Sequence, residues 1–209
     1  MTYETILIYI TTSIILAITP GPDNIFVMIQ TLQHGIRSGL AIVLGLCTGL
    51  IFHTLLVALG LAALLIAHNS LLLLVKSLGV MYLLYLAYKS WIAHTNDQNY
   101  TKFKKMKFKA LYIRGIIMNI TNPKVTLFFL AFLPQFVSTS SSTITQDIIF
   151  LGFLFMLITL FVFGGVAFLS GTVGNRFKKN LKYQRILNKI SSLIFVTIAL
   201  YLIVEEISL

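Results

Sequence analysis

The chain has few acidic residues, a single cysteine and a low overall content of charged residues. Only 6 of its 209 residues are Asp or Glu, and charged residues together make up 11%, against about 25% in soluble domains. Hydrophobic residues reach 57%. Because so little polar surface cannot cover a folded chain of this length in water, the composition predicts an integral membrane protein.

The single cysteine, Cys47, lies within an apolar run. One cysteine excludes an intrachain disulfide and a cysteine-based metal site. The apolar N-terminus has no Lys or Arg before Arg37, so it lacks the basic region of a cleaved secretory signal. We therefore expect it to remain as a first membrane span.

Six segments are long and apolar enough to cross a bilayer, whose core takes about 20 helical residues. They cover residues 6–29, 40–67, 71–93, 111–137, 148–173 and 187–204. This pattern predicts an all-α membrane protein that forms a single domain over residues 1–209. We expect two halves, about 1–94 and about 110–209, joined by a basic linker at about 95–109.

The basic residues give the chain a net charge of +10 and also an expected orientation. They gather in the first, third and fifth connectors, which the positive-inside rule places in the cytoplasm. The fourth connector has no basic residue, and the two tails carry only Glu4, Glu205 and Glu206. Both termini are thus predicted outside, and the basic loops indicate membrane topology rather than binding of nucleic acid.

Proline occurs only four times, and three of these residues interrupt two predicted spans. Pro20 and Pro22 flank Gly21 in the first span, and Pro123 follows Asn122 in the fourth. Proline removes a backbone donor and clashes with the preceding turn, so neither helix is expected to be continuous. A second half-helix should begin at each break, with Gly21 or Asn122 as its cap and proline at its first position.

Each break also carries one charged residue. Asp23 and Lys124 lie 101 positions apart (124 − 23) in a chain of 209 residues. With three spans in each half, the second half must enter the membrane in the opposite direction. Interrupted helices at corresponding places in two inverted halves are typical of secondary transporters, whose site lies at the repeat interface. We therefore predict two inverted three-helix repeats, with the first and fourth helices broken.

A charge at the bilayer centre costs about 2.5–3.5 kcal/mol, so both charged residues should have partners. Asp23 suits the positive end of its half-helix, but Lys124 has the unfavourable sign there. Lys124 should therefore have an anion nearby, which is Asp23, the substrate, or each in turn. One fixed carboxylate and one fixed ammonium are complementary to an amino acid, which predicts a zwitterionic substrate.

Uncharged polar residues at the same depth could orient the backbone of such a substrate. They are Thr19, Asn24, Asn119, Thr121 and Asn122. The alternative is that Asp23 and Lys124 only form an interhelical ion pair, with the asparagines as helix caps. His53 is either a proton relay or a hydrogen-bond partner of a neighbouring helix, and Tyr82 and Tyr85 either line the cavity or pack.

At these residues the chain resembles the LysE/RhtB family of bacterial amino-acid exporters. The resemblance covers almost the whole chain. It is carried by Pro20-Gly21-Pro22, His34 to Gly39, Gly79 to Ala87, Asn119 to Lys124, and Phe128 to Phe136. It implies a six-span carrier of the bacterial inner membrane that exports amino acids or close derivatives, in exchange for protons and without a cofactor. The motif positions it implies are Pro20, Gly21, Pro22, Asp23, Asn119, Asn122, Pro123 and Lys124.

We thus expect a secondary exporter, not an enzyme, that works by alternating access around Asp23 and Lys124, with an amino acid, protons and the bilayer as partners. The alternative is export of a divalent cation, as in cadmium-resistance relatives of this superfamily. One intramembrane carboxylate with one cysteine and a lysine makes a poor site for such an ion, so no metal site is predicted. A chain this small often pairs in the membrane, and a homodimer is compatible with the sequence.

Overall fold

A computed structural model of the protein describes residues 1–19, 21–67, 69–92, 106–137 and 143–173, together with scattered positions between 186 and 204. These residues are helical apart from caps and turns, and no strand occurs among them. The all-α class is therefore confirmed. The elements are α1 (Tyr3–Ile18), α2 (Pro22–His34), α3 (Ile36–Ala67), α4 (Asn69–Ile92), α5 (Phe108–Ile120), α6 (Pro123–Leu127), the π-helix η1 (Phe128–Phe132), the 3₁₀-helix η2 (Leu133–Phe136) and α7 (Ile144–Val173).

The predicted first and fourth spans are both bent, at the predicted motifs. α1 and α2 meet at 57°, and α5 meets the helix from Pro123 to Phe136 at 48°. α2 has Gly21 as its N-cap and Pro22 in its first turn. In α6 the cap is Asn122, whose side-chain oxygen accepts a hydrogen bond from the Lys124 backbone N–H at 2.9 Å. Both predicted restarts are confirmed, while Pro20 lies outside the described residues.

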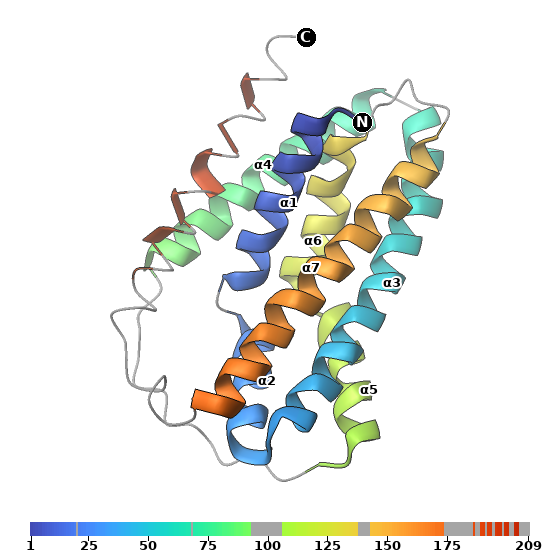
Figure 1. The fold of residues 1–209 in the computed structure, drawn as a ribbon. Coiled ribbons are helices and arrows are strands. Elements are labelled where there is room, and N and C mark those ends of the chain that lie inside the picture. Colours follow the sequence, from blue (N-terminus) through green and yellow to red (C-terminus); the bar gives the residue numbers. More distant parts are fainter. Residues whose placement is uncertain are drawn as a thin grey trace.

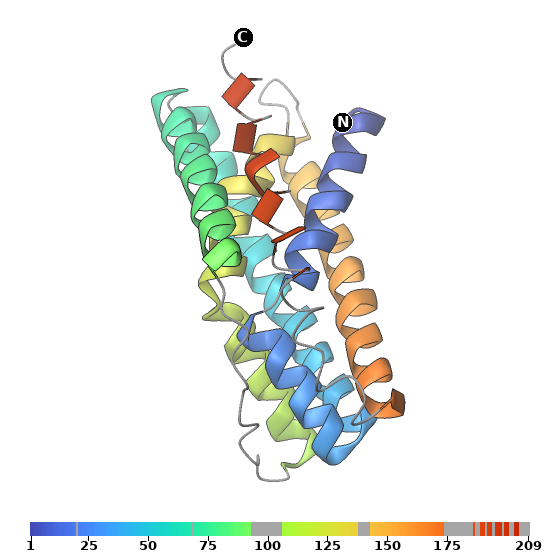
Figure 2. The ribbon, with the colours of Figure 1, turned by 90° about the vertical axis from the view of Figure 1, so that its left-hand side faces the viewer.

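The two broken spans run in opposite directions. In Figure 1 the chain descends through α1 and α2 and ascends through α5, α6 and η1, and the view turned by 90° agrees (Figure 2). α3 and α7 pass alongside both, and α3 packs mainly against α5 and α7. This is the orientation that an inverted repeat requires. The six-helix repeat itself stays a prediction, because the sixth span is described only at scattered positions.

Between the first two predicted spans the connector is shorter than the sequence suggests. α2 ends at His34 and α3 begins at Ile36, so only Gly35 separates them. Gly35 has φ 88°, which a residue with a side chain adopts only at a cost, and this conformation reverses the chain within one residue. Arg37 consequently lies in the first turn of α3 rather than in a loop.

The outer surface of the helices is apolar. Among the described residues, α3 from Ile36 to Gly60 and α7 from Ile144 to Thr172 are long and apolar enough to cross a membrane, and each bent pair adds one span if it is counted as such. Large apolar side chains point outward from both, including Leu59 (73% exposed) and Phe161 (75% exposed). A surface of this kind is suited to lipid rather than water.

The remaining two predicted spans differ in how much of them is described. The third corresponds to α4, which packs against η1. For the sixth, Phe195 and Ala199 are buried, and the Ser192 hydroxyl donates to the Ala87 carbonyl of α4 at 2.7 Å. The linker residues 93–105 lie outside the described part of the chain.

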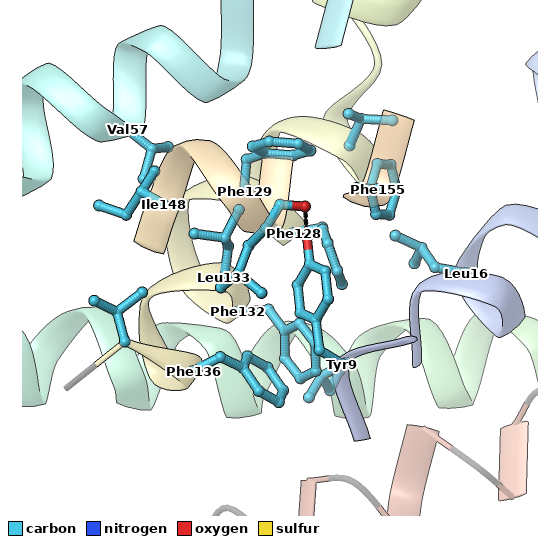
Figure 3. Close-up of a cluster of buried hydrophobic side chains, with 14 of the residues drawn as sticks. Tyr9, Leu16, Val57, Phe128, Phe129, Phe132, Leu133, Phe136, Ile148 and Phe155 are labelled. Atoms are coloured by element: carbon cyan, nitrogen blue, oxygen red, sulfur yellow. Dashed lines mark hydrogen bonds between the residues drawn. The ribbon is translucent and has the colours of Figure 1, made fainter. Parts of the chain in front are cut away.

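Two hydrophobic clusters fill the interior: an aromatic cluster around η1, and a second one, here called the lower cluster because it includes residues of α2 and α5, which are drawn in the lower part of Figure 1. The aromatic cluster surrounds η1, and the Tyr9 hydroxyl donates to the Leu151 carbonyl within it at 3.0 Å (Figure 3). Its aromatic members are Tyr9, Phe128, Phe129, Phe132, Phe136, Phe155 and Phe195. The lower cluster joins α2, α3, α5 and α7, and includes Phe26, Ile42, Leu46, Leu111 and Phe163. The two broken helices change direction between these clusters.

Two glycines bring α3 and α5 into direct backbone contact. A Cβ built on Gly45 would meet the Tyr112 carbonyl oxygen, and one built on Gly115 would meet the Ile42 carbonyl oxygen. Small residues at helix crossings allow close approach in membrane proteins. These glycines set the distance between the α3 scaffold and the broken helix.

We expect Gly115→Ala to lower the free energy of unfolding by about 1–3 kcal/mol, because the new methyl group overpacks this contact. The matched control is Gly60→Ala, also on a long helix, where an added Cβ has nothing within 4 Å. The measurement is the thermal unfolding midpoint of both variants in detergent. Equal midpoints for the two would contradict the close contact.

Candidate functional site

A cavity lies where the two hydrophobic clusters meet. The cavity is narrow, with a volume of about 20 Å³, which is room for a water molecule rather than for an amino acid in this conformation. Both breaks and α7 contribute to its wall. The lining residues are Leu16, Ala17, Asp23, Leu46, Asn119, Lys124, Val125, Phe155, Thr159 and Phe163.

Asp23 lies in the first turn of α2 and is 5% exposed. Its Oδ2 accepts a hydrogen bond of 2.6 Å from the Asn122 side-chain amide. Asn122 thus caps α6 with one side-chain atom and holds Asp23 with the other. The helix dipole of α2 also favours a carboxylate at this position. One asparagine therefore connects the two breaks.

Lys124 comes to the same cavity from the start of α6. Its ammonium donates to the backbone carbonyls of Leu16 at 2.9 Å and Thr19 at 3.0 Å. These carbonyls lie at the C-terminal, negative end of α1, where the last carbonyls of a helix lack partners. α1 therefore compensates the charge that is unfavourable at the start of α6.

Asp23 and Lys124 line one cavity without forming an ion pair with each other. Both residues are described, and no contact within 4.0 Å joins their charged groups. The interhelical ion pair, which the sequence left open as an alternative, is thus not present in this conformation. Each charge is held by uncharged hydrogen-bond partners, while the two groups remain close enough to interact electrostatically.

Two further asparagines have side-chain oxygens without a hydrogen-bond partner. Asn24 donates from Nδ2 to the Ala17 carbonyl at 2.8 Å, while its Oδ1 is buried and unpartnered. Asn119 lines the cavity, and its Oδ1 is likewise unpartnered. Buried polar atoms normally find partners, so these atoms mark places for water or a ligand.

His53 is fixed by the end of α5. Its Nε2 lies 3.2 Å from the Asn119 carbonyl oxygen, and its ring centre is 5.6 Å from that of Phe129. His53 thus connects α3 to the second break by a hydrogen bond. This contact is the role of hydrogen-bond partner to a neighbouring helix, which the sequence offered as the alternative to a proton relay. Tyr82 and Tyr85 stack on each other in α4 and are not among the residues that line the cavity.

The two predicted threonines have different environments. Thr19 is buried, but its hydroxyl donates to the Ile15 carbonyl of its own helix, so its backbone carbonyl is the group that meets Lys124. Thr121 is exposed and its hydroxyl donates to the Ile117 carbonyl. Pro22 and Pro123 are exposed and act through the backbone at the two restarts.

Seven of the ten lining residues were not among the predicted site residues, and four of the seven lie on the long helices α3 and α7. Leu46 of α3 and Phe155, Thr159 and Phe163 of α7 lie within long apolar runs without a breaker or a charge. Only the hydroxyl of Thr159 distinguishes any of them from ordinary packing residues. No group of three His, Cys, Asp or Glu side chains suited to a metal occurs in the part of the chain that the structure describes.

Comparison with known proteins places this geometry in context. A family model described as LysE type translocator matches residues 14–206. The chain is 31% identical to the uncharacterized membrane protein YrhP of Bacillus subtilis, over 92% of this chain and 95% of that protein. It is also 31% identical to the homoserine/homoserine lactone efflux protein of Salmonella typhimurium, with 95% of each covered. No solved structure matches.

Proposed function

The chain belongs to the LysE type translocators, a family of transporters rather than enzymes, and we propose that it exports amino acids or close derivatives in exchange for protons. The observation that carries the proposal is the pair of opposite charges in one cavity. Asp23 and Lys124 come from two broken helices, and each is held by uncharged hydrogen-bond partners. An amino acid bound between them would place its ammonium near Asp23 and its carboxylate near Lys124.

The arrangement of the cavity supports a mechanism of alternating access. It lies between the aromatic cluster and the lower cluster, and its wall includes residues of both. Opening one cluster at a time would expose the site to one side of the membrane only. Phe155 belongs to the aromatic cluster and Phe163 to the lower one, and both border the cavity. These two rings would move first when substrate enters or leaves.

Proton exchange is assigned to Asp23. In our proposal the ionised carboxylate binds the substrate ammonium from the cytoplasm, and a proton from outside later takes the place of that ammonium. The Asn122 amide that now donates to Asp23 would hold the carboxyl group in place through both steps. One charge moving across 100 mV is worth about 2.3 kcal/mol, which is enough to drive accumulation.

The relatives support a small polar cargo and a bacterial location. The Salmonella typhimurium relative is named a homoserine/homoserine lactone efflux protein, and a similar protein of Salmonella typhi carries the same name at 32% identity. We therefore propose homoserine-like amino acids as the first cargo to test. We place the protein in the bacterial inner membrane, with both termini outside as the loop charges predict.

A whole-cell export assay tests this function. Bacteria that express the protein and are loaded with labelled homoserine should lose the label several times faster than cells that express Lys124→Met. Collapse of the proton gradient should remove the difference. Equal loss from both strains, with both proteins present in the membrane, would count against amino-acid export.

A further inference from the structure

Thr159 is the exception among the buried threonines of the described chain. The other four donate their hydroxyls to the carbonyl four residues earlier in their own helix; they are Thr12, Thr19, Thr31 and Thr54. Thr159 is 3% exposed, and its Oγ1 has no partner at all. It lies in α7 and lines the cavity that contains Asp23 and Lys124. Its hydroxyl is therefore a buried hydrogen-bonding group without a partner, on a residue of the cavity wall.

Asn119 is a second residue of the cavity wall with an unpartnered side-chain atom. It is 2% exposed, and its Oδ1 has no hydrogen-bond partner. The side chain packs so closely on Gly49 that a Cβ there would lie 2.7 Å from the Asn119 Cβ. A buried polar atom left unpaired costs about 1–3 kcal/mol. Two such atoms in one cavity indicate a place where a ligand, or water before it, supplies hydrogen bonds.

The rest of the lining limits the side chain that the cargo can have. Apart from Asp23 and Lys124, which the proposed function assigns to the ammonium and carboxylate, the lining residues are uncharged. Leu46, Phe155 and Phe163 make most of the remaining wall apolar. A charged cargo side chain would lose its hydration there without a counter-charge, which is costly. A neutral side chain would not.

We propose that Thr159 and Asn119 form a side-chain subsite, which selects neutral cargo with a hydroxyl or similar hydrogen-bonding group. This inference rests on the proposed function and adds the feature that sets its specificity. The Asn119 oxygen accepts a hydrogen bond from the cargo hydroxyl, and the Thr159 hydroxyl donates to or accepts from it. The two atoms come from different helices, α5 and α7, so both must be in place for the full preference.

The test compares homoserine with norvaline, in which a methyl group replaces the hydroxyl. Purified full-length protein in liposomes is assayed for exchange of each labelled compound. The wild type should favour homoserine. Thr159→Val keeps the side-chain shape and should raise the KM for homoserine about three- to tenfold, the loss of one hydrogen bond, with little change for norvaline. Thr159→Ser should retain the preference.

The matched control is Thr172→Val on the same helix, where the hydroxyl is exposed and donates to the Phe168 carbonyl. It should leave both KM values unchanged. An equal shift for homoserine and norvaline in Thr159→Val would show a structural role and overturn the subsite. If Thr159→Val does not fold, Thr159→Ser and the wild-type preference decide the question.

Failure of the subsite and failure of the proposed function give different results. A wild type that moves norvaline or a charged amino acid better than homoserine would be an exporter without this subsite. A folded wild type that moves no amino acid would overturn the proposed function, and the subsite with it.

Discussion

Asp23→Asn should abolish proton-driven export while leaving exchange of substrate for substrate. The amide has the shape of a protonated carboxyl group and still accepts from the Asn122 side chain, so the contact between the two breaks persists. Unlike a carboxyl group, the amide cannot release or take up a proton at this position. In inside-out vesicles with an acidic lumen, we expect gradient-driven uptake of labelled homoserine to fall to background. Exchange between the two sides should continue, although with a higher KM, because a neutral amide binds the substrate ammonium more weakly than a carboxylate does.

The control for this variant is Asp147→Asn. Asp147 lies in the first turn of α7 and is not among the residues that line the cavity. Its substitution should leave both activities at the wild-type rate. Gradient-driven uptake that persists in Asp23→Asn would assign proton coupling to another residue.

Lys124→Met should remove every mode of transport and also weaken the fold. The variant takes away the ammonium that would bind the substrate carboxylate. It also leaves the Leu16 and Thr19 carbonyls at the end of α1 without the hydrogen bonds that Lys124 now donates. An unpaired buried acceptor costs about 1–3 kcal/mol, so the unfolding midpoint should fall as well. Exchange assays and thermal unfolding in detergent measure the two effects separately.

A lysine outside the cavity provides the comparison. Lys89 of α4 is exposed and lies over the Tyr85 ring, so Lys89→Met should change neither property strongly. Lys124→Arg keeps the charge but replaces a compact ammonium by a planar fork, and should restore stability better than transport. Normal exchange in Lys124→Met would remove this residue from the binding site.

The breaks of the first and fourth spans could be predicted because proline and glycine act locally. Pro22 and Pro123 open half-helices wherever the chain places them, and Asn122 caps its helix through its own backbone neighbours. The length of the first connector is harder to predict from the sequence. It depends on Gly35 adopting φ 88°, and the sequence shows only that a glycine is present.

The partners of the two charges depend on the fold rather than on local sequence. Lys124 was expected to have an anion nearby, and Asp23 does line the same cavity, but the hydrogen bonds of Lys124 go to the carbonyls of Leu16 and Thr19, more than 100 positions earlier. Those carbonyls exist because α1 ends at Ile18, and only the packing of the two breaks brings them to Lys124. Thr159 could not be identified from local sequence either, because it differs from the other buried threonines only in that its hydroxyl has no hydrogen-bond partner in the folded chain.

The most direct test of the account is uptake of labelled amino acids into inside-out vesicles that contain the wild type, Asp23→Asn or Lys124→Met, with and without an acidic lumen. The account predicts gradient-dependent uptake of one chemical group of amino acids by the wild type. That uptake should be absent from both variants, with exchange retained in Asp23→Asn alone. Wild-type vesicles that take up no amino acid, or variants that match the wild type, would contradict it.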